Sequence, residues 1–259
     1  MIPFTKMHGN GNDFVLIDEY KKLKIPEKDK PSFVRAVCNR RFGVGADGVL
    51  FVQPSEIADV KFRYFNSDGS EAEMCGNGIR CFARYVVEEG YTGRNPKIET
   101  LAGVIEVEVD YSNEWWIRVD MGKPKLDGVW DYKGYKLYSV NTGVPHVVIF
   151  VNSLNFDIVP IAREIRYLSL FPNGTNVNFV RVLDRKKIEI RTYERGVEDE
   201  TLSCGTGSVA AVAVANKLNL VNDFVEVVTR GGVLKVELKD SAYLIGSAKR
   251  VFDGVIKEL

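Results

Sequence analysis

The stretch Leu202-Ser203-Cys204-Gly205-Thr206-Gly207-Ser208 and the apolar run at 209–215 (VAAVAVA) decide how the rest of the chain is interpreted. Small polar residues ahead of an uncharged run are typical of the N-terminus of a buried helix. Gly205 and Gly207 allow other groups to approach the backbone closely, and the first N–H groups of a helix have no partner within it. We therefore expect this helix N-terminus to hold an anion and to lower the pKa of the Cys204 thiol.

The same motif occurs a second time in the chain. Cys75-Gly76-Asn77-Gly78 repeats the Cys-Gly-x-Gly spacing, and 129 positions (204 − 75) separate the two cysteines. The stretch 100–105 (TLAGVI) has the same offset from 229–234 (TRGGVL), and 62–66 (FRYFN) parallels 190–194 (IRTYE) at an offset of 128. This match predicts two copies of one α/β unit related by a pseudo-twofold axis, each presenting a cysteine at a helix N-terminus.

Composition restricts the class of protein. The chain has 259 residues, of which 45% are hydrophobic and 27% charged, as in an ordinary soluble globular protein. Thirty-five basic residues balance thirty-five acidic ones, so we expect neither nucleic acid nor a membrane as a partner. The sequence contains no apolar run of about 18 residues and no signal peptide, which predicts a cytoplasmic protein. Cys38, Cys75, Cys81 and Cys204 form no Cys-x-x-Cys pair, so we expect free thiols and no metal site.

The pattern of apolar residues predicts the elements of both units. We expect helices over 31–41, 81–87 and 161–170, with Cys38 and Cys81 packed and inert inside the first two. A turn at 9–12 leads into a strand, and further strands are predicted at 49–52, 97–100, 104–109, 116–119, 147–151, 177–182 and 188–193. The C-terminal stretch 248–255 is strand-like and could return to the first unit. We place the domains at 1–116 plus 250–259 and at 117–249, with a ligand cleft expected between them.

Two equivalent cysteines suit one class of reaction particularly well. A racemase or epimerase removes a proton from one face of a carbon and returns one to the other face, so it needs an acid and a base that exchange roles with direction. The N–H groups of Gly76-Asn77 and Gly205-Thr206 are suitable donors to a substrate carboxylate, onto which the developing carbanion spreads. Glu194-Arg195 offers partners for an amino-acid substrate, with Arg for a carboxylate and Glu for an ammonium group. No lysine lies in a recognisable pyridoxal-phosphate context, so a mechanism without a cofactor fits the sequence.

Two other classes remain open on these residues. In a cysteine hydrolase or transferase, Cys204 would be the nucleophile and His146 its base, which leaves Cys75 unexplained. In a non-catalytic anion-binding module, the two helix N-termini would suffice and Cys75→Ala would retain full function. A structural role for His146 is a further alternative.

At these residues the chain closely resembles the diaminopimelate epimerases. The matching stretches cover essentially the whole chain: Lys6-Met7-His8-Gly9, Gly11-Asn12-Asp13-Phe14, Phe65-Asn66, Asp68-Gly69-Ser70, Cys75-Gly76-Asn77-Gly78, Arg80-Cys81, Met121-Gly122, Pro145-His146, Asn176, Tyr193-Glu194-Arg195-Gly196 and Cys204-Gly205-Thr206-Gly207. The resemblance implies an α/β (α+β) fold of two pseudo-symmetric domains. Each would have a mostly antiparallel sheet curled around a central helix, and the last strand would close the first domain.

The resemblance also implies roles for individual residues. Cys204 would be the base towards the LL isomer of 2,6-diaminopimelate and Cys75 the acid, with His146 and Glu194 tuning the thiols. The substrate-binding residues implied are Asn12, Asn66, Gly76, Asn77, Asn176, Glu194, Arg195, Gly205 and Thr206. It implies a small amino-acid substrate, a homodimer, no cofactor, and a place in lysine and peptidoglycan-precursor synthesis. A broader or proline-type amino-acid racemase of the same fold is the nearer alternative.

Two positions depart from the family pattern. Many members carry Gln where this chain has Gly48, and Asn where it has Val144. Both are usually substrate contacts, and loss of two polar groups would loosen discrimination at the distal end of the substrate. We therefore expect this chain to accept other α-amino acids, such as lysine, more readily than its relatives.

Overall fold

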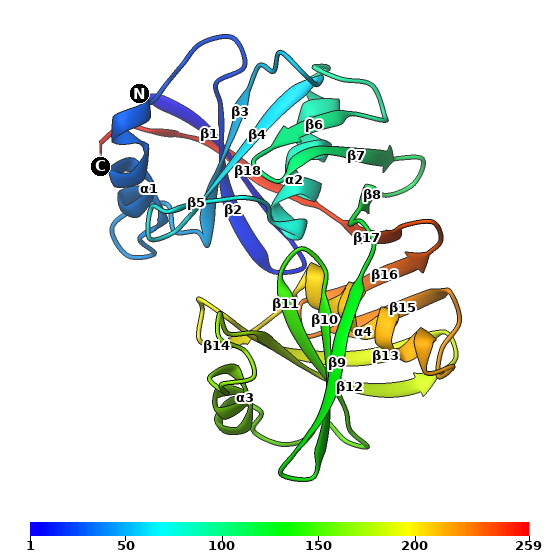
Figure 1. Cartoon of the computed structure of the whole chain (residues 1–259). Coiled ribbons are helices and arrows are strands. Elements are labelled where there is room, and N and C mark those ends of the chain that lie inside the picture. Colours follow the sequence, from blue (N-terminus) through cyan, green and yellow to red (C-terminus); the bar gives the residue numbers. More distant parts are fainter. Residues whose placement is uncertain (259) are drawn as a thin grey trace. The chain divides into compact units, whose positions relative to one another are not determined.

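The structure is a computed structural model that describes residues 1–258 (Figure 1). Its contacts divide the chain into two compact units. Unit 1 comprises Met1–Val119 and the C-terminal stretch from Gly246, and unit 2 comprises Asp120–Ile245. Each unit is a mixed α+β structure built mostly of strands, as the sequence predicted. Among residues 1–258, none of the helices has the length and apolar character needed to cross a membrane.

Unit 1 contains a sheet in which all neighbouring strands are antiparallel except for two pairs. In the order in which they pair, its strands are β18 (Lys249–Ile256), β1 (Ile2–Gly9), β2 (Asn12–Asp18), β3 (Gly48–Gln53), β4 (Val60–Asn66), β6 (Lys97–Thr100), β7 (Gly103–Asp110) and β8 (Trp116–Asp120). The short β5 (Glu71–Ala72) also pairs with β4. The parallel neighbours are β2–β3 and β4–β6. The predicted return of the C-terminal strand is confirmed, because β18 pairs with β1 from Ile2↔Ile256 onward.

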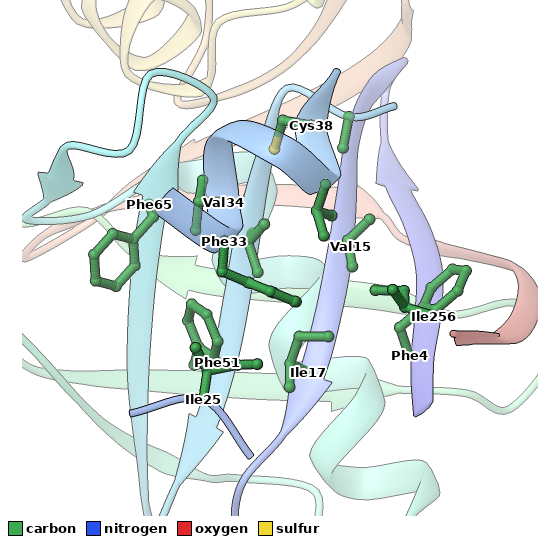
Figure 2. Packing of buried hydrophobic residues seen from close by; sticks show 13 residues of the cluster. Phe4, Val15, Ile17, Ile25, Phe33, Val34, Cys38, Phe51, Phe65 and Ile256 are labelled. Carbon is green, nitrogen blue, oxygen red and sulfur yellow. The ribbon is translucent and has the colours of Figure 1, made fainter. Parts of the chain in front are cut away.

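Two helices cover the two faces of this sheet. α2 (Gly76–Glu88) packs against β1, β2, β3, β4 and β7, so the sheet curls around it. α1 (Lys30–Cys38), preceded by the short η1 (Glu27–Asp29), lies on the other face. Figure 2 shows Phe33 and Val34 of α1 among side chains of the strands, including Ile17 and Phe51. Each such fully buried side chain stabilises the unit by roughly 1.5–3 kcal/mol.

Unit 2 repeats this topology strand by strand. Its order is β9 (Lys125–Tyr132), β10 (Tyr135–Asn141), β11 (Pro145–Phe150), β12 (Asn176–Asp184), β13 (Lys187–Glu194), β15 (Phe224–Thr229), β16 (Gly232–Leu238) and β17 (Ala242–Ser247), with the short β14 (Asp199–Thr201) on β13. The parallel neighbours β11–β12 and β13–β15 occupy the same places as those of unit 1. α4 (Gly205–Lys217) is the central helix and α3 (Val159–Arg166) packs against β12 and β13. The predicted repetition of one α/β unit is therefore confirmed in the topology of each unit.

Some elements differ from the sequence prediction. The strand β9 was not predicted, and neither were β5, β10, β14 and β17. Most residues of β9 are exposed or half-buried, so the strand has no buried face to give a regular apolar pattern. β5 and β14 are two and three residues long and mostly polar. The helix predicted over 161–170 begins at Val159 and ends at Arg166.

Candidate active site

Cys75 is the N-cap of α2, as the repeat predicted. Its backbone is extended (φ −140°, ψ 118°), and its Sγ accepts a hydrogen bond from the Gly78 N–H with a donor–acceptor distance of 3.5 Å. The cap therefore engages the third N–H of the helix, while the N–H groups of Gly76 and Asn77 precede the intrahelical ladder. Gly76 and Asn77 are both buried. These N–H groups form the anion-binding end of the helix dipole.

A tight hairpin delivers Asn12 to the same place. β1 and β2 are joined by the two-residue turn Asn10-Gly11, in which both residues have positive φ (52° and 86°). Asn-Gly is the preferred pair for a type I′ turn, and it makes Asn12 the first residue of β2, opposite Gly9. A Cβ on Gly9 would lie 3.1 Å from the Asn77 carbonyl oxygen, so the glycine allows β1 to approach the start of α2.

The Asn12 carboxamide connects three residues around Cys75. Its Nδ2 donates to Asp47 Oδ2 at 2.7 Å, and its Oδ1 accepts from Asn77 Nδ2 at 3.2 Å. Cys75 Sγ lies 3.7 Å from the same Oδ1 and can donate its S–H to it. The structure therefore brings together Asn12, Cys75 and Asn77, all of which the sequence selected, and adds Asp47, which it did not. We call this cluster the Cys75 site.

Arg80 anchors the Cys75 site from within α2. Its side chain is fully buried, with Nη1 donating to the Gly76 carbonyl oxygen and Nη2 to the Oδ1 atoms of Asn10 and Asn77, each at 2.9 Å. Burial lowers the pKa of Arg80 to about 10, so the guanidinium remains a cation at neutral pH. One feature of the sequence points to this role, because the repeat has the apolar Val209 at the position equivalent to Arg80.

Asn66 and Gly48 lie opposite each other on neighbouring strands. Asn66 ends β4, pairs with Gly48 of β3, and donates from Nδ2 to Ser70 Oγ at 3.1 Å. A Cβ on Gly48 would lie 2.5 Å from both the Phe65 carbonyl oxygen and the Tyr64 ring. The glutamine of the family pattern described above would therefore have no room at position 48 unless the backbone or the ring moved.

Cys204 is the N-cap of α4 and has different neighbours from Cys75. Its Sγ accepts from the Gly207 N–H at 3.4 Å, lies 3.4 Å from Thr206 Oγ1, and hydrogen-bonds to Glu194. Burial, and then the Glu194 charge, raise the pKa of the Cys204 thiol well above its usual value, although Thr206 and Gly207 oppose the shift. The expected lowering of this pKa is therefore wrong, because desolvation and a carboxylate outweigh the helix N-terminus.

Glu194 holds the position in unit 2 that Asn66 holds in unit 1. It is the last residue of β13, just as Asn66 is the last residue of β4. Its Oε1 accepts a hydrogen bond from Thr201 Oγ1 at 2.8 Å. The equivalent place thus carries a proton acceptor beside Cys204 and a neutral amide in the other unit. We call Cys204, Gly205, Thr206 and Glu194 the Cys204 site.

The tautomer of His146 follows from its contacts. Asn178 Nδ2 donates to the Val147 carbonyl oxygen at 2.9 Å, which fixes the amide orientation, and it lies 3.1 Å from His146 Nδ1. Asn178 Oδ1 accepts from Thr192 Oγ1 at 3.0 Å, in agreement with that orientation. Nδ1 is therefore an acceptor and Nε2 carries the proton of the neutral ring. Burial first, and then the charge of Arg195, lower the pKa of this fully buried histidine to about 3.

Asn176 and Arg195 join the ends of two strands. Asn176 Oδ1 accepts from the Arg195 backbone N–H at 2.8 Å, and its Nδ2 donates to the Pro145 carbonyl oxygen at 3.0 Å. Arg195 Nη1 donates to the Asn173 carbonyl oxygen at 2.9 Å. Val144, the second departure from the family pattern, directly precedes Pro145 and is half-buried. Substrate contacts by Asn176 and Arg195 stay predictions.

The other two cysteines are packed, as predicted. Cys38 and Cys81 are buried, and burial raises the pKa of each thiol to about 12. All four cysteines are free thiols. Within residues 1–258, no group of three or more His, Cys, Asp or Glu side chains is arranged to hold a metal ion.

Comparisons with known proteins agree with this arrangement. The family model described as diaminopimelate epimerase matches residues 4–126 and 138–251. A diaminopimelate epimerase from Archaeoglobus fulgidus is 63% identical over 271 residues, covering 99% of this chain and 96% of the relative. Among solved structures, a PhzF-family phenazine biosynthesis protein from Bacillus anthracis has a TM-score of 0.75 at 19% identity and covers 98% of this chain and 99% of its own. A probable proline racemase from Agrobacterium radiobacter has a TM-score of 0.74 at 16% identity, with 99% and 93% covered. At these identities the two structures show a common fold.

Proposed function

The chain belongs to the diaminopimelate epimerase family and is an isomerase, and from this premise we propose that it interconverts LL- and meso-2,6-diaminopimelate by a two-base mechanism that uses Cys75 and Cys204. This reaction would serve lysine and peptidoglycan-precursor synthesis. The observation that carries the proposal is the duplication. Two units with the same strand order each place a half-buried cysteine at the N-cap of the central helix.

The first step requires a base and an electrostatic partner for the carbanion. The Cys204 thiolate takes the α-proton from one face of the carbon, and the electron pair left behind spreads onto the α-carboxylate. The N–H groups ahead of the helical ladders, those of Gly76-Asn77 and of Gly205-Thr206, are donors of the kind that stabilise this charge. Such preorganised donors are each worth about 3–4 kcal/mol in comparable sites.

The second step returns a proton to the opposite face. The Cys75 S–H supplies it, so one turnover leaves Cys204 as a thiol and Cys75 as a thiolate. The reverse reaction starts from that state with the roles exchanged, and each direction restores the thiol state that the other requires. No proton is gained or lost overall.

The surroundings of the two thiols support this assignment of roles. Glu194 is hydrogen-bonded to Cys204 and its charge raises the pKa of that thiol, so Cys204 becomes a thiolate when Glu194 itself takes up the proton. Asn12 presents an amide oxygen to Cys75, and this oxygen can accept a hydrogen bond but not a proton. Cys204 is therefore suited to act as the base towards the LL isomer, and Cys75 as the acid.

Solvent deuterium incorporation tests the proposal directly. LL-diaminopimelate is incubated in D2O with the wild type, Cys75→Ala or Cys204→Ala, and the α-carbon is followed by NMR. We expect deuterium incorporation with inversion in the wild type and loss of epimerisation in both variants. Cys38→Ala is the matched control, because Cys38 is the last residue of α1 and is buried in the core, so this variant should leave epimerisation unchanged.

Each contrary outcome has a definite meaning. No exchange by the wild type would refute the substrate or the reaction class. Epimerisation retained in one of the two variants would refute the two-base mechanism and favour an anion-binding role for that helix N-terminus.

The geometry of His146 disfavours a cysteine hydrolase. A hydrolase needs a basic imidazole nitrogen facing the nucleophile. In this chain Asn178 occupies Nδ1, Nε2 carries the proton, and the pKa of His146 is lowered to about 3. The neutral ring carries its proton at Nε2, which is buried and has no hydrogen-bond partner among the described residues, and it is a poor general base, so it is not suited to generate a thiolate.

Substrate breadth and assembly complete the proposal. A broader or proline-type racemase activity is the second candidate, favoured by Gly48 and Val144 in place of polar side chains. A homodimer, a cytoplasmic location and the absence of nucleic-acid and membrane partners stay predictions. Light scattering after size-exclusion chromatography tests the homodimer.

A further inference from the structure

The carboxamide of Asn12 can adopt only one orientation in this structure. On one side its Nδ2 faces Asp47 Oδ2 at 2.7 Å, and a carboxylate only accepts hydrogen bonds. On the other side its Oδ1 faces Asn77 Nδ2 at 3.2 Å. Reversing the amide would place an oxygen against a carboxylate and an NH2 group against an NH2 group.

The groups beyond Asn12 are fixed in the same direction. Asn77 Oδ1 accepts from Arg80 Nη2 at 2.9 Å, and because a guanidinium only donates, the Asn77 NH2 group must face Asn12. At the other end, Asp47 Oδ1 accepts from Arg40 Nη2 at 2.7 Å. The chain of hydrogen bonds therefore runs one way, from the buried Arg80 cation through two amides to the Asp47 anion.

The direction of this hydrogen-bond chain determines which atom of the Asn12 amide faces Cys75. The Asn12 oxygen, and not the NH2 group, lies 3.7 Å from Cys75 Sγ. A carbonyl oxygen accepts the hydrogen bond of a thiol and repels a thiolate, whereas an amide NH2 group would do the opposite. We propose that Asp47 is a positioning residue that holds the Asn12 oxygen towards Cys75 and thereby keeps Cys75 in its protonated form.

The other charged groups around Cys75 do not by themselves keep its thiol protonated. Arg80 on the same helix is a cation and favours the thiolate, while Cys81 is a buried neutral thiol. Beyond Asn12, the carboxylates of Asp13 and Asp47 are matched by the cations of Arg40 and Lys6, with Asp13 bonded to both. The oriented Asn12 amide therefore supplies a specific preference for the thiol that this nearly balanced set of charges does not.

The inference rests on the proposed function, in which Cys75 donates a proton to the substrate. An acid that is already a thiolate in the free enzyme cannot do so. Asp47 would thus determine, through Asn12, which of the two cysteines begins the LL-to-meso reaction as the acid.

The test measures the ionisation of Cys75 without using activity. The full-length wild type, Asp47→Asn, Asn12→Ala and the double variant are alkylated with iodoacetamide between about pH 6 and 10, and the Cys75 peptide is quantified by mass spectrometry. We expect the midpoint of the Cys75 profile to fall by about 0.5–1 pH unit in Asp47→Asn, which is about a 3- to 10-fold rise in thiolate at neutral pH. The midpoint, and not the plateau rate, is compared because the plateau also reports access to the thiol.

A double-mutant comparison separates orientation from charge. Asn12→Ala should lower the midpoint as Asp47→Asn does, and adding Asp47→Asn to Asn12→Ala should change it little further. Asp253→Asn is the matched control, because Asp253 is an arginine-paired carboxylate of the same unit that is hydrogen-bonded to Arg250 and Thr5. This control should leave the Cys75 midpoint unchanged.

Two results would overturn the inference. An unchanged midpoint in both Asn12→Ala and Asp47→Asn would show that the oriented amide does not control Cys75. If Asp47→Asn shifts the Cys75 midpoint equally in the wild type and in the Asn12→Ala variant, the effect comes from the charge of Asp47 and not from the orientation of Asn12. If the loop of Asp47 fails to fold in Asp47→Asn, Asn12→Ala alone still decides whether the Asn12 oxygen keeps Cys75 protonated, and an unchanged midpoint there refutes the inference. Either refutation leaves the proposed function standing when the wild type still exchanges deuterium.

Discussion

The two glycines at the third position of the central helices should tolerate alanine very differently. Gly78 and Gly207 are equivalent in the repeat, and each donates its N–H to the cysteine that caps its helix. A Cβ on Gly207 would lie 2.4 Å from Asn178 Oδ1, whereas one on Gly78 would first meet Leu50 Cδ2 at 3.2 Å. Asn178 Oδ1 belongs to an amide that hydrogen bonds hold in place, whereas Leu50 Cδ2 is the end of a flexible side chain.

The magnitude follows from what Asn178 would lose. Its carboxamide has three hydrogen-bond partners, Val147, His146 and Thr192, so it cannot move aside without breaking buried hydrogen bonds. Overpacking costs about 1–3 kcal/mol and an unsatisfied buried polar group about 1–3 kcal/mol. The higher helix propensity of alanine offsets about 0.5–1 kcal/mol of this loss in the free energy of unfolding. We expect Gly207→Ala to lower the free energy of unfolding by about 2 kcal/mol and Gly78→Ala to change it by less than about 0.5 kcal/mol.

Thermal unfolding followed by circular dichroism measures the difference. At about 2–4 °C per kcal/mol for a chain of this size, Gly207→Ala should lower Tm by about 4–8 °C. Gly78→Ala is the matched control in the same structural position of the other unit. Equal changes in Tm for the two variants, or a larger loss for Gly78→Ala, would refute the reasoning that Asn178 is fixed against α4.

Three further outcomes are expected. The pKa of His146 is lowered from 6.5 to about 3 in the folded chain, so between these pH values the unfolded chain binds more protons than the folded chain. The contribution of His146 to the free energy of unfolding is therefore complete above pH 6.5 and falls towards pH 3. In urea unfolding, His146→Gln should lose less stability than the wild type between about pH 7 and 5. If Cys75 and Cys204 act on one carbon, mild oxidation should join them in a disulfide and abolish activity until a reductant is added, whereas activity unaffected by oxidant would contradict the mechanism. Racemisation of lysine, followed by chiral chromatography, should be readily measurable beside epimerisation of diaminopimelate; negligible lysine activity would contradict the broader specificity expected from Gly48 and Val144.

Much of the fold could be predicted because the duplication encodes the same topology twice in the sequence. The offset that links Cys75 to Cys204 also links the strands around them, so each unit supported the assignment of the other. The Asn10-Gly11 pair predicted a turn for a local reason, since both residues must adopt positive φ. The strand β9 was missed because it has no buried face and so produces no apolar alternation.

The residues that orient the site were harder to find, because their partners are distant in the sequence. Asp47 acts on Asn12 and Arg80 acts on Asn10, at separations of 35 and 70 positions. Asn178 gave a usable signal, since a polar residue within the apolar stretch 177–180 must find hydrogen-bond partners when the strand is buried. A motif of catalytic residues identifies the chemistry, whereas the groups that orient them depend on pairings that only the folded chain supplies.

The pKa of Cys204 shows why a motif alone does not determine the state of a thiol. Both cysteines cap a helix through the same N–H bond, so a helix N-terminus by itself predicts two similar thiols. The ends of β4 and β13 break this equality, with Asn66 in one unit and Glu194 in the other. A two-base epimerase requires this inequality, because two thiols or two thiolates could not complete a turnover. The duplication thus supplies two equivalent positions, and side chains in which the copies differ, such as Asn66 and Glu194, make the two thiols unequal.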